Sequence, residues 1–173
     1  LEELRRSLSH LGLDDHYEIA VERFAAGSID SLRVFVQLTR HETGHRHLAQ
    51  IRRIIQESGL PERVRERSVR IFQRLAEAEA KVHGTTPEKV HFHEVGAVDA
   101  IVDIVGTCLA VEYFDPKKMW RSPLVTGRGQ VQCQHGLIPV PAPAVMNLAL
   151  GSTVRFLDVE AELTTPTGAA ILT

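Results

Sequence analysis

The chain has 173 residues, of which 43% are hydrophobic and 24% charged, and its net charge is −2 with neutral histidines. This length and composition suit one folded domain with a sizeable core and exclude a disordered chain. The charge balance argues against a nucleic-acid-binding surface, and no apolar run reaches the roughly 18 residues of a membrane-spanning helix. The two cysteines, Cys108 and Cys133, indicate no disulfide framework, so we expect a protein of the reducing cytoplasm.

The first half of the chain reads as helices around one pair of strands. A stripe of leucines predicts a helix at its start, which Gly12 ends. Alternating apolar residues then predict two strands, and a longer apolar periodicity predicts two helices. The second of these helices is charged along one side, which we interpret as a solvated surface. The predicted helices cover residues 2–11, 47–58 and 61–83, and the predicted strands cover 17–22 and 32–38.

The second half mixes short strands and helices. Asp115-Pro116 predicts the end of a helix that begins near Ala97, and Thr165 predicts the N-cap of a final helix opened by Pro166. The elements do not alternate as regular βαβ units, so we predict a single α+β domain over 1–173 and not a doubly wound sheet. Between these two helices the pattern predicts strands at 119–126, 129–135, 137–140 and 154–160, and a short helix at 142–150.

Two histidines, one glutamate and two aspartates occur within thirteen residues at the centre of the chain. On a strand, His91 and His93 share one face, and on the following helix Asp99 and Asp103 are i,i+4 neighbours. Gly96 lies between them and allows a sharp turn. Imidazole and carboxylate groups are ligands of divalent metals, so these four residues form a predicted metal site. The alternative is that the same four residues form a buried ion-pair network.

Two further groups of residues carry weaker metal signals. The polar run that contains His41, His45 and His47 is best interpreted as a loop leading to a helix N-cap, although a helical conformation would let His41 and His45 share a metal. Cys133, on a predicted strand, could supply a soft ligand for a transition metal. Cys108, within an apolar helix, is interpreted as a small buried hydrophobe.

The end of the chain offers a candidate anion site. Threonine hydroxyls and free amides at a helix N-terminus bind anions, which makes Thr165, Thr167 and Gly168 candidates for contact with a phosphate. The alternative is a simple structural cap. His135, in a turn before the proline-rich segment 139–144, is a candidate for contact with a ligand or for proton transfer, or it serves the turn alone.

Three motifs in the same order resemble those of the LarC nickel insertion family. They read HFHEVGAVDAIVDIVG, HGLIPVPAPA and ELTTPTGAAIL and lie at 91–106, 135–144 and 162–172. The resemblance implies insertion of nickel into the pyridinium bisthiocarboxylate mononucleotide cofactor of lactate racemase, as a metal chelatase of the lyase class. It also implies that the full-length protein uses CTP with a divalent metal, at a site outside this chain. The family's first strand with its glycine-rich segment and its C-terminal domain are absent here, and a homo-oligomer stays open.

The chemistry of these residues suggests roles for them in such a reaction. His91 and His93 would hold nickel, Asp99 or Asp103 would tune the metal ligands or accept a ring proton, and the helix that follows Thr165 would seat the phosphate. One alternative is a non-catalytic module that presents nickel to the C-terminal domain. Another is a metal-dependent hydrolase, which we disfavour because no later DH or isolated HxxxD element completes a two-metal set.

Overall fold

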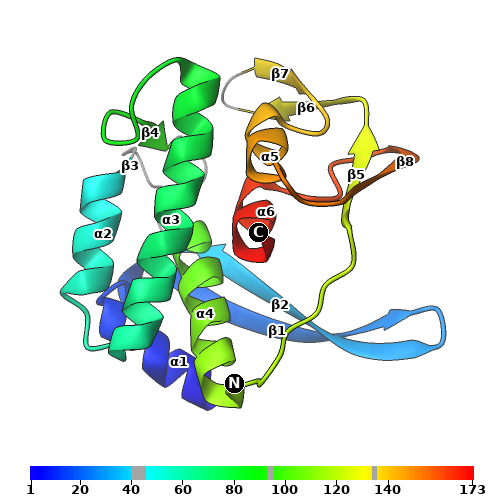
Figure 1. The fold of residues 1–173 in the computed structure, drawn as a ribbon. Helices are drawn as coiled ribbons and strands as arrows, with labels where there is room; N and C mark the ends of the chain where they lie inside the picture. Colours follow the sequence, from blue (N-terminus) through cyan, green and yellow to red (C-terminus); the bar gives the residue numbers. More distant parts are fainter. Residues whose placement is uncertain (40–45, 93–95, 134–135) are drawn as a thin grey trace.

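The computed structural model describes residues 1–39, 46–92, 96–133 and 136–173, and in them four small sheets lie around a body of packed helices (Figure 1). This mixture confirms the predicted α+β class. The helices are α1 (Glu2–Leu8), η1 (Ser9–Leu11), η2 (Asp14–His16), α2 (Leu48–Gln56), α3 (Glu62–His83), α4 (Val98–Phe114), α5 (Pro143–Leu148) and α6 (Pro166–Leu172). The strands are β1 (Tyr17–Ala26), β2 (Ile29–Leu38), β3 (Arg46–His47), β4 (His91–Phe92), β5 (Leu124–Arg128), β6 (Gln130–Cys133), β7 (Gly136–Pro139) and β8 (Val154–Glu160).

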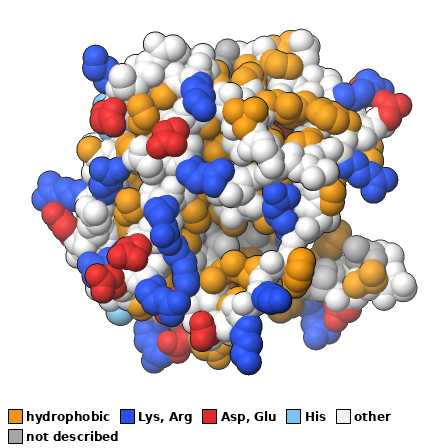
Figure 2. All heavy atoms as spheres, in the orientation of Figure 1, with side chains coloured by type: hydrophobic (Ala, Val, Ile, Leu, Met, Phe, Trp, Pro, Cys, Tyr) orange, Lys and Arg blue, Asp and Glu red, His pale blue; other side chains and the backbone are white. Residues whose placement is uncertain are grey.

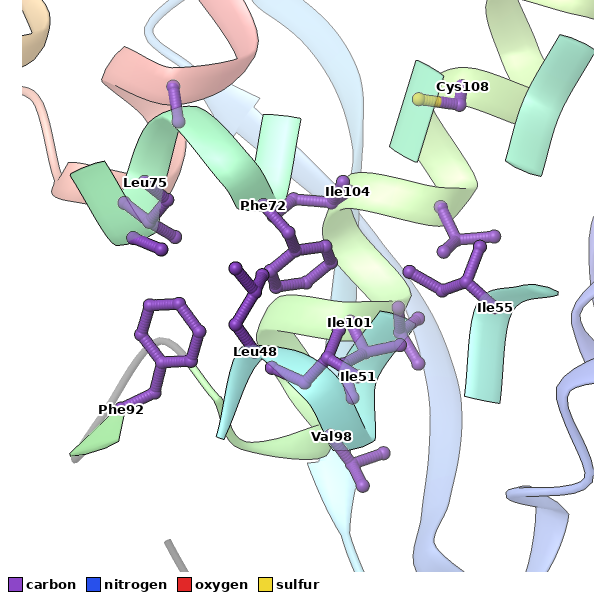
Figure 3. Packing of buried hydrophobic residues seen from close by; sticks show 14 of the residues in the cluster. Leu48, Ile51, Ile55, Phe72, Leu75, Phe92, Val98, Ile101, Ile104 and Cys108 are labelled. Carbon is purple, nitrogen blue, oxygen red and sulfur yellow. The ribbon is translucent and has the colours of Figure 1, made fainter. Parts of the chain in front are cut away.

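Helix α3 is the centre of the packing, because α2, α4, α5 and α6 all contact it. Helix α4 is apolar on most of its surface, and Ile101 and Ile104 are fully buried between the helices. Figure 3 shows Phe92 of β4 beside Leu48 and Phe72 in this cluster. The Phe72 and Phe92 rings meet edge to face with centroids 6.5 Å apart. The short strand β4 is therefore anchored in the core by its one apolar side chain.

The sheets of the described residues each contain two strands. β1 and β2 form a long antiparallel hairpin that projects beyond the helices (Figure 1). β3 pairs with β4 and β6 pairs with β7, both antiparallel, whereas β5 and β8 are parallel. A parallel pair needs a crossover connection, and here the crossover contains β6, β7 and α5.

Most predicted elements are confirmed, with corrections at their ends. The first helix continues as the 3₁₀ helix η1, and Gly12 ends it in the left-handed region with φ 66°. The strand predicted at 119–126 begins only at Leu124. Met119 and Trp120 are 70% and 87% exposed, and among the described strands none pairs with residues 119–123. Each arm of the first hairpin is longer than predicted and continues to a tight turn at Gly27.

The surface shows no strong segregation of charge on the face in Figure 2, where basic and acidic side chains lie among hydrophobic ones. None of the described helices is long and apolar enough to cross a membrane.

Candidate functional site

A pocket of about 430 Å³ opens between the C-terminal end of α3, strand β4, the first turns of α4 and the segments around β6, β7, α5 and α6. It brings together five of the residues predicted from the sequence, although they come from distant parts of the chain. Its lining residues with polar or reactive side chains are Glu79, His83, His91, Asp99, Asp103, Gln132, Cys133, Glu162, Thr165 and Thr167.

The turn between β4 and α4 places His91 on one side and Asp99 on the other. Gly96 is needed there because of a close approach: a Cβ at this position would lie 2.6 Å from Phe92 Cβ and 3.3 Å from the carbonyl oxygens of Arg46 and Phe92. The Arg46 guanidinium donates a hydrogen bond to the Gly96 carbonyl oxygen at 3.2 Å. Gly96 thus lies against the preceding strand, and that contact is what excludes a side chain there, while residues 93–95 of the turn lie outside the described residues.

The two predicted aspartates lie one turn apart at the beginning of α4. Asp99 Oδ1 accepts a hydrogen bond from the Ala100 amide at 2.8 Å, which stabilises the carboxylate in the first turn of the helix. Although Asp103 is exposed at the mouth of the pocket, the loss of part of its hydration there and, to a lesser extent, the nearby Asp99 charge raise its pKa. The pocket therefore holds one carboxylate engaged by the backbone and a second that is a stronger base than an ordinary aspartate.

His91 lies beside His47, a member of the polar run that carries a weaker metal signal in the sequence. In the β3–β4 sheet His47 lies directly opposite His91, and their ring centroids are 4.1 Å apart. His47 is also the N-cap residue of α2. The predicted partner His93 lies outside the described residues, as do His41 and His45. Within the described residues, neither Asp99 nor Asp103 forms an ion pair with His91, so the alternative ion-pair network gains no support there.

Helix α3 contributes two pocket residues that the sequence reasoning missed. Glu79 and His83 are i,i+4 neighbours whose Oε2 and Nε2 atoms lie 3.6 Å apart. Their spacing was visible in the sequence, but it was interpreted as part of a solvated charged side. Glu162, just before α6, was also missed, whereas Cys133 is half-buried at the pocket as a soft ligand would need to be.

The ligand groups line the pocket without meeting at one point. Among the described residues no group of three or more histidine, cysteine, aspartate or glutamate side chains is arranged to hold a metal ion. The full predicted set includes His93, so its convergence stays a prediction. The same observation gives the hydrolase alternative no preformed metal centre in this part of the chain.

The predicted cap at α6 is confirmed. Thr165 Oγ1 accepts a hydrogen bond from the Gly168 amide at 3.1 Å. Thr165 and Thr167 line the pocket, whereas Gly168 does not, and its amide is already engaged by the cap. His135 lies outside the described residues. Phosphate binding at this helix stays a prediction, and its strongest remaining candidates are the two threonines.

The pocket has a clear electrostatic preference. Its described lining includes four carboxylates, those of Glu79, Asp99, Asp103 and Glu162, and neither lysine nor arginine. Carboxylates close together in a partly desolvated space attract cations and repel anions. The opposite side is formed largely by small or apolar residues such as Val131, Ile138 and Ala142. The arrangement suits a divalent metal together with a flat organic group.

Comparison with known proteins agrees with this chemistry. The family described as nickel insertion protein matches residues 1–173. This chain belongs to the nickel insertion protein family. A pyridinium-3,5-bisthiocarboxylic acid mononucleotide nickel insertion protein from Desulfitobacterium hafniense is 48% identical over 170 residues, covering 98% of this chain and 42% of the relative. A protein of the same name from Acetivibrio thermocellus is 44% identical over 178 residues, covering 97% of this chain and 44% of the relative.

The chain thus spans less than half the length of these curated relatives. No solved structure matches it. The family is established by sequence, and the pocket geometry comes from this chain alone.

Proposed function

We propose that this chain forms the part of a nickel insertion protein that binds Ni²⁺ and presents it to a pyridinium bisthiocarboxylate mononucleotide. In this proposal both nickel and the mononucleotide are substrates, and the product is the nickel cofactor of lactate racemase. The observation that carries the proposal is the pocket in which His91, Asp99 and Asp103 face a largely neutral wall. The names of the relatives supply the identity of the organic substrate.

The reaction needs two kinds of help from the protein. Nickel must be delivered to the two thiocarboxylate sulfurs, and a ring carbon must exchange its proton for a bond to nickel. His91 would present the metal, since imidazole suits nickel and releases it to sulfur ligands. Asp103 would accept the ring proton, a role that its raised pKa favours because a stronger base captures a proton more readily. The Asp99 carboxylate would stabilise the positive charge of the incoming cation.

The pocket also suggests how the organic substrate lies. The pyridinium ring is a cation, so the carboxylates would face it while Val131, Ile138 and Ala142 pack against its surface. Thr165, Thr167 and His135 would contact the phosphate at the edge, with Gly168 supporting the cap. We assign CTP and its divalent metal to the rest of the full-length protein, because the described pocket has four carboxylates and no basic lysine or arginine for a triphosphate.

Nickel binding measured by calorimetry tests the metal half of this proposal. The double variant His91→Ala plus His93→Ala should bind nickel about tenfold or more weakly, a loss of at least about 1.4 kcal/mol. His10→Ala removes an exposed histidine from η1 and serves as the control, which should bind as the parent does. A folded double variant with unchanged affinity would show that nickel does not bind at this segment.

A second candidate function is a nickel-binding module without catalysis. The observation that favours it is the lack of a closed metal site in the described residues, because a donor that must release its metal needs few protein ligands. Nickel insertion measured in a single turnover separates the two functions. If Asp103→Asn slows insertion while nickel affinity is kept, the pocket takes part in the chemistry. If Asp103→Asn keeps the insertion rate of the parent, and the rates of other variants follow their nickel affinities alone, the chain is a delivery module.

A further inference from the structure

We infer that His47 and His91 together form the nickel-donating site, with one imidazole from each strand of the β3–β4 pair. This inference rests on the proposed function, because nickel is the metal in question. Its starting point is geometry: the two residues are directly opposite in the antiparallel register, and their ring centroids lie 4.1 Å apart at an interplanar angle of 53°. Neither strand would provide this pair alone, and His47 is separated from His91 by α2 and α3 in the sequence.

The spacing of the rings is close to that of two imidazoles on one metal ion. A ring nitrogen binds a first-row metal at about 2.1 Å, which puts two rings on one ion with centres about 4.6 to 5.3 Å apart. The observed 4.1 Å is about half an ångström short of this range, a difference that a small rotation of the two side chains would close. Parallel stacking would instead bring the ring planes together, and the tilt of 53° excludes that arrangement. The pair is thus close to the geometry of two cis ligands before any metal is bound.

The ring of His47 is held in the way that metal-binding histidines usually are. Its Nδ1 lies 3.2 Å from the Val90 carbonyl oxygen, and a carbonyl oxygen can only accept a hydrogen bond. The tautomer with the proton on Nδ1 makes this contact a hydrogen bond and leaves the lone pair on Nε2, whereas the other tautomer lets the ring accept from the Gln50 amide as the cap of α2. Ligating histidines commonly donate their second ring nitrogen to a backbone carbonyl, which fixes the ring and the tautomer. The main chain of His47 is fixed as well, since its N–H donates to Gln50 Oε1 at 2.8 Å.

Two protein ligands suit a site that gives its metal away. His91 lines the pocket and His47 does not, so the ion would sit at the rim, where two imidazole nitrogens leave the remaining positions open. The two thiocarboxylate sulfurs of the substrate can then complete four-coordinate nickel before the imidazoles leave. No third protein ligand is needed for this step, in agreement with the absence of a three-ligand group among the described residues.

The test uses the full chain, Ni²⁺ alone as the probe, and two readouts. Nickel affinity should fall about tenfold in His47→Ala and also in His47→Asn, which keeps a side chain able to cap α2. X-ray absorption at the nickel edge, which counts imidazoles by their outer-shell scattering, should show at least two in the parent and one fewer in each variant. His10→Ala should change neither quantity.

The outcomes separate this inference from the function on which it rests. A parent protein that binds no nickel overturns the proposed function. Binding that depends on His91 but is unchanged in folded His47→Asn, with the same imidazole count, overturns the His47 assignment alone. If the His47 variants do not fold, the spectrum of folded His93→Ala decides, because it retains His47 and His91, and fewer than two imidazoles on its nickel contradicts the paired site.

Discussion

The two walls of the pocket are built in different ways. The helical wall, from α3, β4 and α4, carries both described histidines and three of the four carboxylates. Its elements are fixed in the core through residues such as Phe72, Phe92 and Ile101. The strand wall, from β6, β7 and the segments leading to α5 and α6, is mostly neutral and belongs to small two-stranded sheets. Groups that must be placed accurately for metal chemistry thus lie on the wall with the deeper packing.

This difference suggests that the two walls have different functions. The helical wall would set the positions of metal ligands and proton acceptor, while the strand wall would shape the space for the organic substrate. Close backbone contacts exclude a side chain at Gly96, beside the helical wall, and at Gly127 in β5, whose partner strand β8 leads into the α6 segment of the strand wall. The two walls can therefore be perturbed separately.

The largest expected effect on stability is next to the strand wall, in Gly127→Ala of the β5–β8 pair. A Cβ at this position would lie 2.2 Å from the Ala161 carbonyl oxygen and 2.6 Å from that of Val159, so the β5–β8 pair must shift. Because both neighbours are backbone atoms, we expect a loss of about 3 kcal/mol or more in the free energy of unfolding. Urea unfolding followed by circular dichroism measures it. A loss below about 1 kcal/mol would mean that the two strands separate easily.

Gly96→Ala is the matched change on the helical wall. Its Cβ would meet Phe92 Cβ at 2.6 Å and two carbonyl oxygens only at 3.3 Å, so we expect a smaller loss of stability than in Gly127→Ala. Nickel affinity should nevertheless fall more in Gly96→Ala, because this turn orients His91 against Asp99. If Gly127→Ala, measured where it is still folded, loses more nickel affinity, the proposed division between the walls is wrong.

The sequence predicted local features of both walls better than it predicted contacts between distant segments. Local signals suffice for a cap such as Thr165 or an i,i+4 pair such as Asp99 and Asp103, because these depend on neighbours in the chain. The pairing of strands that are distant in sequence cannot be predicted from such local signals. Nothing in the sequence near His47 indicates that His91 will lie opposite it in the β3–β4 sheet. The carboxylate of Glu79 was missed for a related reason, since a charged residue on an amphipathic helix looks the same whether it faces water or a pocket.

An intermediate loss of stability is expected when the N-cap of α6 is removed. Thr165→Ala removes the acceptor of the Gly168 amide and should cost about 1 kcal/mol of stability, whereas Thr165→Ser should keep most of it. Thermal unfolding of the three proteins measures this. The same variants test the phosphate prediction: if the threonine also contacts phosphate, Thr165→Ala weakens binding of the mononucleotide more than binding of its dephosphorylated nucleoside. Equal weakening of both ligands would leave Thr165 as a structural cap only.

The smallest expected change in the free energy of unfolding is in Asp103→Asn. This variant tests the electrostatics of the helical wall most directly. The folded protein raises the pKa of Asp103 above its ordinary value of about 3.9, so it binds that proton more tightly than the unfolded chain does. The contribution of this carboxyl to stability therefore decreases as pH rises from its ordinary pKa through its raised one, and stays reduced at neutral pH.

Asparagine keeps the shape but cannot titrate, so Asp103→Asn should be more stable than the parent at pH 7, by no more than about 0.5 kcal/mol for so exposed a position. The gain should disappear as pH falls below about 4, where both Asp103 and its unfolded reference are protonated. Scanning calorimetry of both proteins between pH 3 and pH 8 measures this difference. With added nickel the parent should become more stable than Asp103→Asn at pH 7, because a bound cation stabilises the ionised carboxylate of Asp103. A variant less stable than the parent at pH 7 without metal would show that Asp103 is satisfied by the protein alone and is not held ready for a cation.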